Sequence, residues 1–271
     1  MALPAAARAV VTGAGSGLGR ALCVEIARRG GRVVASDVNV EAARATAASL
    51  GGDAHAVACD VTKLEDVERL AAEVNRLFGG VDLVVNNAGV AVGGEVGAVP
   101  VADWRWIVDV NLWGPVYGCH VFVPRLRKQG RGHVLNVASA AGLLAAPGMG
   151  PYNVTKSAVV ALSETLYGEL AGTGVGVSVL CPTFFQTNIT KASRVTGAAD
   201  QVELANTLMA GAKIQADGVA RFAIDAVERG KLYVLPHPDG RWIWRIKRLA
   251  PRMFHTLTPK LLALRAGRRR A

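Results

Sequence analysis

Short apolar runs alternate with longer amphipathic runs along most of this chain. The short runs, such as Arg8–Gly13 and Arg32–Asp37, are rich in valine and predict strands. In the longer runs, such as Leu64–Phe78, apolar residues recur at helical spacing and predict helices. The pattern predicts strands over residues 8–13, 32–37, 54–60, 81–89, 132–139, 175–182 and 231–236, and helices over 17–29, 41–50, 64–78, 103–126, 152–170 and 217–228.

These strands are apolar on both faces and are separated by helices, which implies a parallel sheet covered on both sides. The sequence therefore predicts a doubly wound (Rossmann) α/β fold with a seven-stranded parallel sheet. Its 271 residues fit one large domain over residues 1–240, with a C-terminal extension over 241–271. Asp103 is predicted to be the N-cap of its helix. The polar segment Thr183–Asn206 lacks strong periodicity and is a candidate for a mobile lid.

Several classes of protein are disfavoured by the apolar segments and the cysteines. No window has eighteen uninterrupted apolar residues, and a removable signal peptide would destroy the glycine motif that follows Val10 and Val11. A cytoplasmic protein is therefore expected. The four cysteines match no metal or CxxC spacing and are expected to be reduced and buried. His120 and His133 lie among apolar residues and are expected to be structural, so no metal site is predicted.

The net charge of +10 belongs to the end of the chain. Residues 241–271 hold ten Arg or Lys and no Asp or Glu, so 21 of the 31 basic residues remain to balance 21 acidic residues elsewhere. A basic body that binds nucleic acid is therefore not expected.

A glycine run, Thr12–Gly19, follows the first strand and opens the first helix. Glycines let a backbone approach a pyrophosphate, and a helix N-terminus supplies free N–H groups and a positive dipole end. Asp37 ends the next strand, where a carboxylate can bind ribose hydroxyls and would repel a 2′-phosphate. NAD is therefore favoured over NADP. Asp60-Val61 and Asn86-Asn87-Ala88-Gly89 end the third and fourth strands and are expected along the same crevice.

Tyr152 and Lys156 stand four residues apart, so both project from one face of a helix. A phenol has a reference pKa of about 10, and a fixed ammonium nearby lowers that pKa. The pair is therefore expected to form a proton-transfer group. Ser139 closes the fifth strand, and Asn111 interrupts a predicted helix with an unfavourable residue.

Together these motifs, in this order and spacing, resemble the short-chain dehydrogenase/reductase family over roughly residues 7–236. The resemblance implies a catalytic tetrad of Asn111, Ser139, Tyr152 and Lys156. It also implies that Thr187, after Pro182, contacts the nicotinamide carboxamide; Thr183 stands where the family often has glycine. The residues expected to contact the cofactor are Gly13, Ser16, Gly17, Leu18, Gly19, Asp37, Asp60, Val61, Asn87, Ala88, Gly89, Tyr152, Lys156, Pro182 and Thr187.

The resemblance implies an NAD-dependent interconversion of a secondary alcohol and a ketone. Tyr152 would exchange the proton, Ser139 would steady the substrate oxygen, and Asn111 would hold a relay water. Apolar residues flank these positions and predict a lipid-, steroid- or retinoid-like substrate: Leu143, Leu144, Ala145, Ala146, Pro147, Met149, Phe184 and Phe185. The alternative is a catalytically silent dinucleotide-binding redox sensor or scaffold, which would not need all four groups.

The extension over 241–271 interleaves basic residues with tryptophans and aliphatic residues. Such a segment suits peripheral contact with an anionic membrane surface. It would equally suit packing on the body or on a second subunit, or disorder. The helices around Trp104–Val123 and Tyr152–Leu170 resemble those that build family oligomers, so a homodimer or homotetramer is expected.

Overall fold

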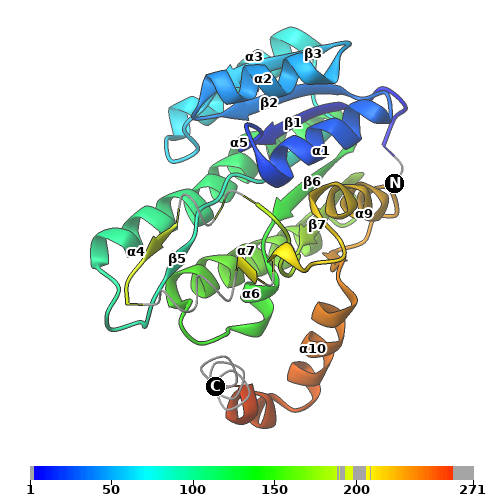
Figure 1. Ribbon diagram of the computed structural model, residues 1–271. Helices are drawn as coiled ribbons and strands as arrows, with labels where there is room; N and C mark the ends of the chain where they lie inside the picture. Colours follow the sequence, from blue (N-terminus) through cyan, green and yellow to red (C-terminus); the bar gives the residue numbers. More distant parts are fainter. Residues whose placement is uncertain (1–2, 188, 190–192, 198–205, 208, 259–271) are drawn as a thin grey trace.

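A seven-stranded parallel sheet, in the order β3-β2-β1-β4-β6-β7-β9, organises the molecule (Figure 1). The computed structural model describes residues 3–187, 189, 193–197, 206–207 and 209–258. The strands are β1 (Arg8–Thr12), β2 (Arg32–Asp37), β3 (Ala54–Ala58), β4 (Leu83–Asn86), β6 (Gly132–Val137), β7 (Val175–Leu180) and β9 (Tyr233–Val234). All six pairings between them are parallel, which confirms the predicted fold.

Helices cover both faces of this sheet (Figure 1). One face carries α1 and α9, which pack on each other, and the opposite face carries α3, α5 and α7. The helices are α1 (Gly17–Arg28), α2 (Val40–Leu50), α3 (Leu64–Phe78), α4 (Val101–Val108), η1 (Asp109–Trp113), α5 (Gly114–Gln129), α6 (Ala140–Leu144), α7 (Gly150–Glu169), α9 (Ala216–Glu228) and α10 (Pro238–Leu249).

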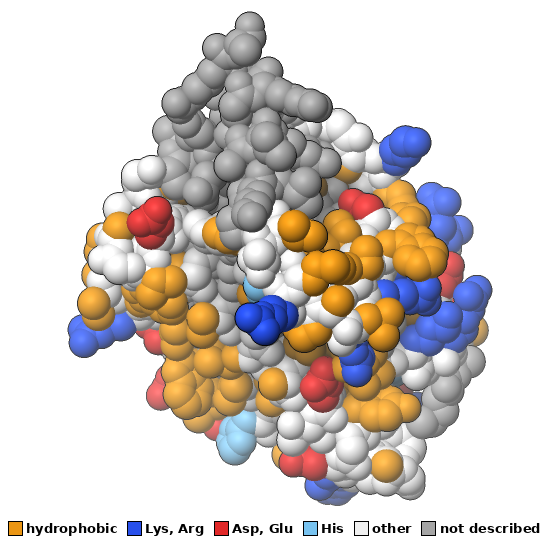
Figure 2. Space-filling view, turned by 90° about the horizontal axis from the view of Figure 1, so that it is seen from below, with side chains coloured by type: hydrophobic (Ala, Val, Ile, Leu, Met, Phe, Trp, Pro, Cys, Tyr) orange, Lys and Arg blue, Asp and Glu red, His pale blue; other side chains and the backbone are white. Residues whose placement is uncertain are grey.

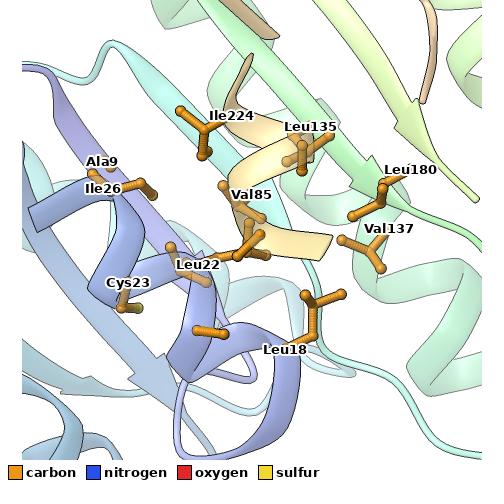
Figure 3. Close-up of a cluster of buried hydrophobic side chains, with 14 of the residues drawn as sticks. Ala9, Leu18, Leu22, Cys23, Ile26, Val85, Leu135, Val137, Leu180 and Ile224 are labelled. Carbon is orange, nitrogen blue, oxygen red and sulfur yellow. The ribbon is translucent and has the colours of Figure 1, made fainter. Parts of the chain in front are cut away.

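Successive residues of each strand point to opposite faces of the sheet and pack in different hydrophobic clusters. Ala9 and Val11 of β1 pack with Leu22 of α1 and Ile224 of α9 (Figure 3). Val10, between them, packs on the opposite face with the side chains of α3 and α5. Because the parallel strands are aligned by register, their carboxyl ends meet at one edge of the sheet.

The helix predicted from Asp103 begins two residues earlier, at Val101, with Pro100 as its N-cap. The N-cap prediction for Asp103 is therefore wrong. Proline is favoured near a helix start because it has no N–H to satisfy, and this outweighs the capping preference of an aspartate. Asp103 instead lies in the first turn, where its charge favours the helix dipole. The π-helical turn η1 then connects α4 to α5.

The segment predicted as a lid lies partly outside the described residues. Within its described part, β8 (Arg194–Val195) pairs in parallel with β5 (Val92–Gly93) to form a separate two-stranded sheet. Arg194 forms an ion pair with Asp103 at 2.8 Å and lies over the ring of Trp106. These contacts tie β8 to α4.

The C-terminal helix α10 crosses the boundary expected at residue 240 and extends away from the sheet (Figure 1). Trp244 packs against Tyr233 of β9 with the ring centroids 5.1 Å apart and the rings tilted by 48°. Lys247 donates a hydrogen bond of 2.7 Å to the carbonyl of Leu143. The first part of the extension therefore packs on the body.

The cysteines and His133 are structural, as expected. Cys23, Cys59, Cys119 and Cys181 are free and buried, and burial raises the pKa of each thiol to about 12. His133 is buried, contacts Ser178 Oγ at 2.8 Å, and has a pKa lowered to about 3 by burial. His120 is exposed, contrary to the apolar neighbours around it in the sequence.

Candidate active site

The glycine run forms a tight turn between β1 and α1. Gly13 and Gly17 have positive φ values of 65° and 51°, a conformation that favours glycine. A Cβ on Gly19 would clash with the carbonyl of Gly13, so the helix can start this close to the strand only with glycine there. Asn87, after β4, donates 2.8 Å and 3.2 Å hydrogen bonds from Nδ2 to the carbonyls of Thr12 and Gly13 and so holds the turn.

The N-terminus of α1 suits an anion. Its N-cap, Ser16, is extended and makes no side-chain capping hydrogen bond, so the first turn keeps N–H groups for a ligand. Asp37 accepts a 2.9 Å hydrogen bond from the N–H of Gly15, which places its carboxylate beside the turn. These groups fit the pyrophosphate and adenosine ribose of a dinucleotide.

Thr12 is a site residue that the predicted contacts missed. Its Oγ1 accepts hydrogen bonds from the N–H groups of Asn87 and Ala88, at 3.0 Å and 3.1 Å. One hydroxyl thereby joins the carboxyl ends of β1 and β4. The position of a threonine directly before the glycine run was the available signal.

Three of the residues predicted to contact the cofactor have side chains that contact other protein groups. Leu18 is buried in the core, and Val61 is buried against Gly114. Asp60 accepts hydrogen bonds from the backbone N–H and the hydroxyl of Thr62. Leu18 and Val61 can therefore meet a cofactor only through their backbone.

Tyr152 lies on α7 beside Ser139, which follows β6. Ser139 is the N-cap of α6, and its Oγ accepts a 3.1 Å hydrogen bond from the N–H of Ala141. The Ser139 hydroxyl hydrogen is therefore directed away from this acceptor role and can be donated to the Tyr152 phenol or to a substrate oxygen. Burial raises the pKa of the Tyr152 phenol, and its interaction with the Ser139 side chain opposes that rise.

Lys156 is one turn further along α7, with its Nζ 5.8 Å from the centroid of the Tyr152 ring. Its ammonium donates a 2.9 Å hydrogen bond to the carbonyl of Val137, and burial lowers its pKa to about 8. The expected lowering of the phenol pKa is wrong for the protein groups alone. The phenol pKa is raised because desolvation by burial outweighs the groups that lower it.

Asn111 lies in the π-helical turn η1 and is completely buried. Its Oδ1 accepts from the N–H of Val90 at 2.8 Å, and its Nδ2 donates to the carbonyl of Val90 at 2.9 Å. The side chain expected to hold a relay water thus binds the backbone of Val90, in the loop after β4.

Gly89 brings these groups together. A Cβ on Gly89 would lie 3.3 Å from both Asn111 Oδ1 and Lys156 Nζ. A Cβ on Gly17 would lie 3.7 Å from the Cβ of Thr187, so the chain after Pro182 passes beside the glycine turn. The predicted residues of the glycine turn and of the tetrad therefore share one edge of the sheet.

A family model for short chain dehydrogenases matches residues 7–197. The chain belongs to the short-chain dehydrogenase/reductase family. It is 36% identical over 250 residues to a 1-deoxy-11-beta-hydroxypentalenate dehydrogenase of Streptomyces exfoliatus, with 90% of each chain covered. It is 33% identical over 255 residues to a probable oxidoreductase EphD of Mycobacterium bovis, covering 89% of this chain and 43% of that protein.

Among solved structures, a short-chain dehydrogenase/reductase from Burkholderia phymatum in complex with NAD is similar in fold. The TM-score is 0.87 and the identity 35%, over 92% of this chain and 95% of that one. This member of the short-chain dehydrogenase/reductase family is therefore an oxidoreductase with a nicotinamide-dinucleotide-binding Rossmann fold.

Tyr152 packs against apolar side chains that the prediction did not name. Tyr152, Trp104 and Trp106 each pack against a cluster formed by the buried side chains of Val92, Val99 and Ile107. Phe184 is exposed, whereas Phe185 and Leu143 are buried in the core. Their contact with a substrate stays a prediction. Among the described residues, no cluster of His, Cys, Asp and Glu could hold a metal ion.

Proposed function

We propose that this protein is an NAD-dependent dehydrogenase that interconverts a secondary alcohol and a ketone on an apolar substrate. One observation carries the proposal: Tyr152, Ser139, Lys156 and Asn111 gather beside the glycine turn at the carboxyl edge of the sheet.

A bound nicotinamide dinucleotide supplies the hydride acceptor for alcohol oxidation and the hydride donor for ketone reduction. Tyr152 takes the substrate hydroxyl proton in oxidation and returns a proton to the carbonyl oxygen in reduction. Ser139 donates its hydroxyl hydrogen to the same oxygen and stabilises the charge that develops there.

Lys156 and Asn111 support this proton transfer. The Lys156 ammonium, mostly protonated at neutral pH because its pKa is about 8, stabilises the phenolate and binds the nicotinamide ribose. Asn111 acts as a positioning residue, since its side chain fixes the backbone of Val90. Thr187 is proposed to contact the carboxamide.

We infer that NAD is preferred over NADP. Asp37 presents a carboxylate beside the turn, where it accepts from ribose hydroxyls and repels a 2′-phosphate. The likeness to a structure in complex with NAD supports this preference. The substrate is inferred to be an apolar alcohol from the apolar cluster against which Tyr152 and the two tryptophans pack, and the relative named for a hydroxylated pentalenate is consistent with that class.

The homo-oligomer and the cytoplasmic location remain predictions. Large exposed apolar side chains on η1 and α7, namely Trp113, Val154 and Tyr167, favour an interface on this side of the protein. Among the residues that the structure describes, no helix is long and apolar enough to cross a bilayer.

The test is a panel of secondary alcohols and ketones, followed by absorbance of the reduced nicotinamide, with NAD and NADP in parallel. For Tyr152→Phe we expect a loss of at least about 100-fold in kcat, with NAD binding retained by calorimetry. If the parent protein binds NAD but turns over no member of the panel, the sensor or scaffold function replaces this proposal. Faster turnover with NADP would contradict the role of Asp37.

A further inference from the structure

The C-terminal helices present an exposed apolar surface that the dehydrogenase chemistry does not use. Six of the 15 large exposed hydrophobic side chains in the described residues lie between positions 242 and 257. Leu249 is 87% exposed and Trp242 is 64% exposed, well above the exposure of ordinary packing residues. The full set is Trp242, Ile243, Ile246, Leu249, Met253 and Leu257.

Within α10 these residues lie opposite the side that packs on the body. Gly240, Trp244 and Lys247 share one face at helical spacing and contact Thr183, Tyr233 and Leu143. Trp242, Ile246 and Leu249 are also spaced at i, i+4 and i+7, about half a turn away. The orientation of α10 is therefore fixed by packing, and its apolar stripe faces outward.

The second helical segment, residues 251–258, continues this surface after a break at Ala250. Met253 and Leu257 help to line an open hollow of about 510 Å³. Its other walls come from Ala250, Pro251, Arg252 and Thr256, so an arginine stands beside the apolar side chains.

The charges beside this stripe have one sign. Residues 238–258 contain five Arg or Lys and one Asp, a net charge of +4. Arg241, Arg245, Arg248 and Arg252 are exposed, whereas Lys247 is partly buried against α6. Figure 2, seen from the side toward which α10 extends, shows hydrophobic side chains lying beside Lys and Arg.

We propose that α10 and residues 251–258 bind the surface of an anionic lipid bilayer, with the apolar stripe inserted at the headgroup level and the arginines on phosphate groups. An apolar stripe bordered by arginine, with tryptophan at its edge, has the chemistry of an interfacial helix. The binding is peripheral.

The other candidates for covering this face are disfavoured by charge. A second copy on a two-fold axis would bring one cluster of +4 against another. Residues 259–271 carry five more basic residues and no acidic residue, so they supply no opposite charge for the arginines of α10.

Co-sedimentation with vesicles tests the proposal on the full-length protein. With phosphatidylcholine and phosphatidylserine at 70:30, we expect a bound fraction at least about fivefold above that with phosphatidylcholine alone, falling as salt rises. Two variants should each lower binding at least about fivefold: Leu249→Glu, and Arg245→Glu with Arg248→Glu.

Matched substitutions elsewhere serve as controls. Val24→Glu replaces an exposed apolar residue of α1, and Arg69→Glu with Arg76→Glu reverses two exposed charges of α3. Both should bind vesicles like the parent. All variants should keep the parent's NAD affinity, since none of these residues lies in the site.

Three results would overturn the proposal. One is equal sedimentation with anionic and neutral vesicles. Another is a loss of vesicle binding in the control variants as large as that in the variants of α10. The third is a parent protein that is an oligomer in analytical ultracentrifugation and a Leu249→Glu variant that is a monomer but binds vesicles like the parent. That result would make this face a protein interface.

Discussion

The phenol of Tyr152 is under two opposing influences in this site. Burial raises its pKa, while the Ser139 side chain lowers it. At neutral pH the phenol is therefore protonated in the protein, which is the form that donates a proton to a ketone. Alcohol oxidation requires the phenolate, so the two directions should depend on pH with opposite sign.

The expected result is a value of kcat/KM for alcohol oxidation that rises with pH from 6 to about 8. The rise should approach about tenfold per pH unit while the phenol remains protonated. Above about pH 8 the slope should decrease, because Lys156 loses the charge that stabilises the phenolate. Ketone reduction should show the reverse trend. Initial rates in both directions over pH 6–10 measure this, and oxidation that falls with pH would contradict the assignment of Tyr152.

At the scale of elements, the contact between α6 and α7 holds two of the proposed catalytic residues together. Ser139 caps α6, and Lys156 lies on α7. Gly142 allows the contact, because a Cβ there would lie 2.5 Å from the backbone carbonyl of Lys156. Ser157 Oγ donates a 2.7 Å hydrogen bond to the carbonyl of Gly142 and fixes the register of the two helices.

Gly142→Ala should therefore push α6 away from α7. We expect a loss of about 1–3 kcal/mol of unfolding free energy and a lower kcat. The matched control is Gly168→Ala in α7, where a Cβ meets nothing within 4 Å. The control should gain about 0.4–1 kcal/mol and keep its activity. Urea unfolding and steady-state rates measure both variants. Equal unfolding free energies for Gly142→Ala and Gly168→Ala would show that the contact between α6 and α7 has room for a methyl group.

Elements with a strong periodic pattern could be predicted from the sequence, whereas those made by distant contacts could not. The strand and helix order, the glycine turn and the clustering of Tyr152 with Lys156 all followed from local spacing. β5 and β8 are two residues each and exist only through pairing across about a hundred residues. Likewise, the partners of Asn111 and Lys156 are backbone groups of Val90 and Val137, which leave no mark in side-chain patterns.

At the scale of the whole molecule, an ion-pair cluster joins α1 to α9 on one face of the sheet. Glu25 is buried in α1 and accepts hydrogen bonds from Arg28 and Arg29, while Arg29 also reaches Asp225 and Glu228 of α9. The guanidinium of Arg28, with that of Arg29, lowers the pKa of Glu25 to about 2. This carboxylate is therefore stabilised by folding.

Because the pKa of Glu25 is lower in the folded chain, its stabilisation is present above about pH 4.5 and is lost as pH falls toward 2. Glu25→Gln should cost about 1–2 kcal/mol at pH 7, a figure reduced because Arg28 is exposed to solvent, and less at pH 3. Urea unfolding at both pH values measures this. Glu73→Gln, at an exposed pair on α3, should have no measurable effect at either pH. An equal cost for Glu25→Gln at both pH values would contradict the electrostatic origin.

The four buried cysteines give the protein intrinsic labels for following its opening. Cys23 lies in α1, Cys59 follows β3, Cys119 lies in α5 and Cys181 follows β7. Alkylation requires an accessible thiolate, so each sulfur should react with iodoacetamide only after its own region has separated from the core. Mass spectrometry of the modified peptides would then rank the regions of the sheet by how readily each one unfolds.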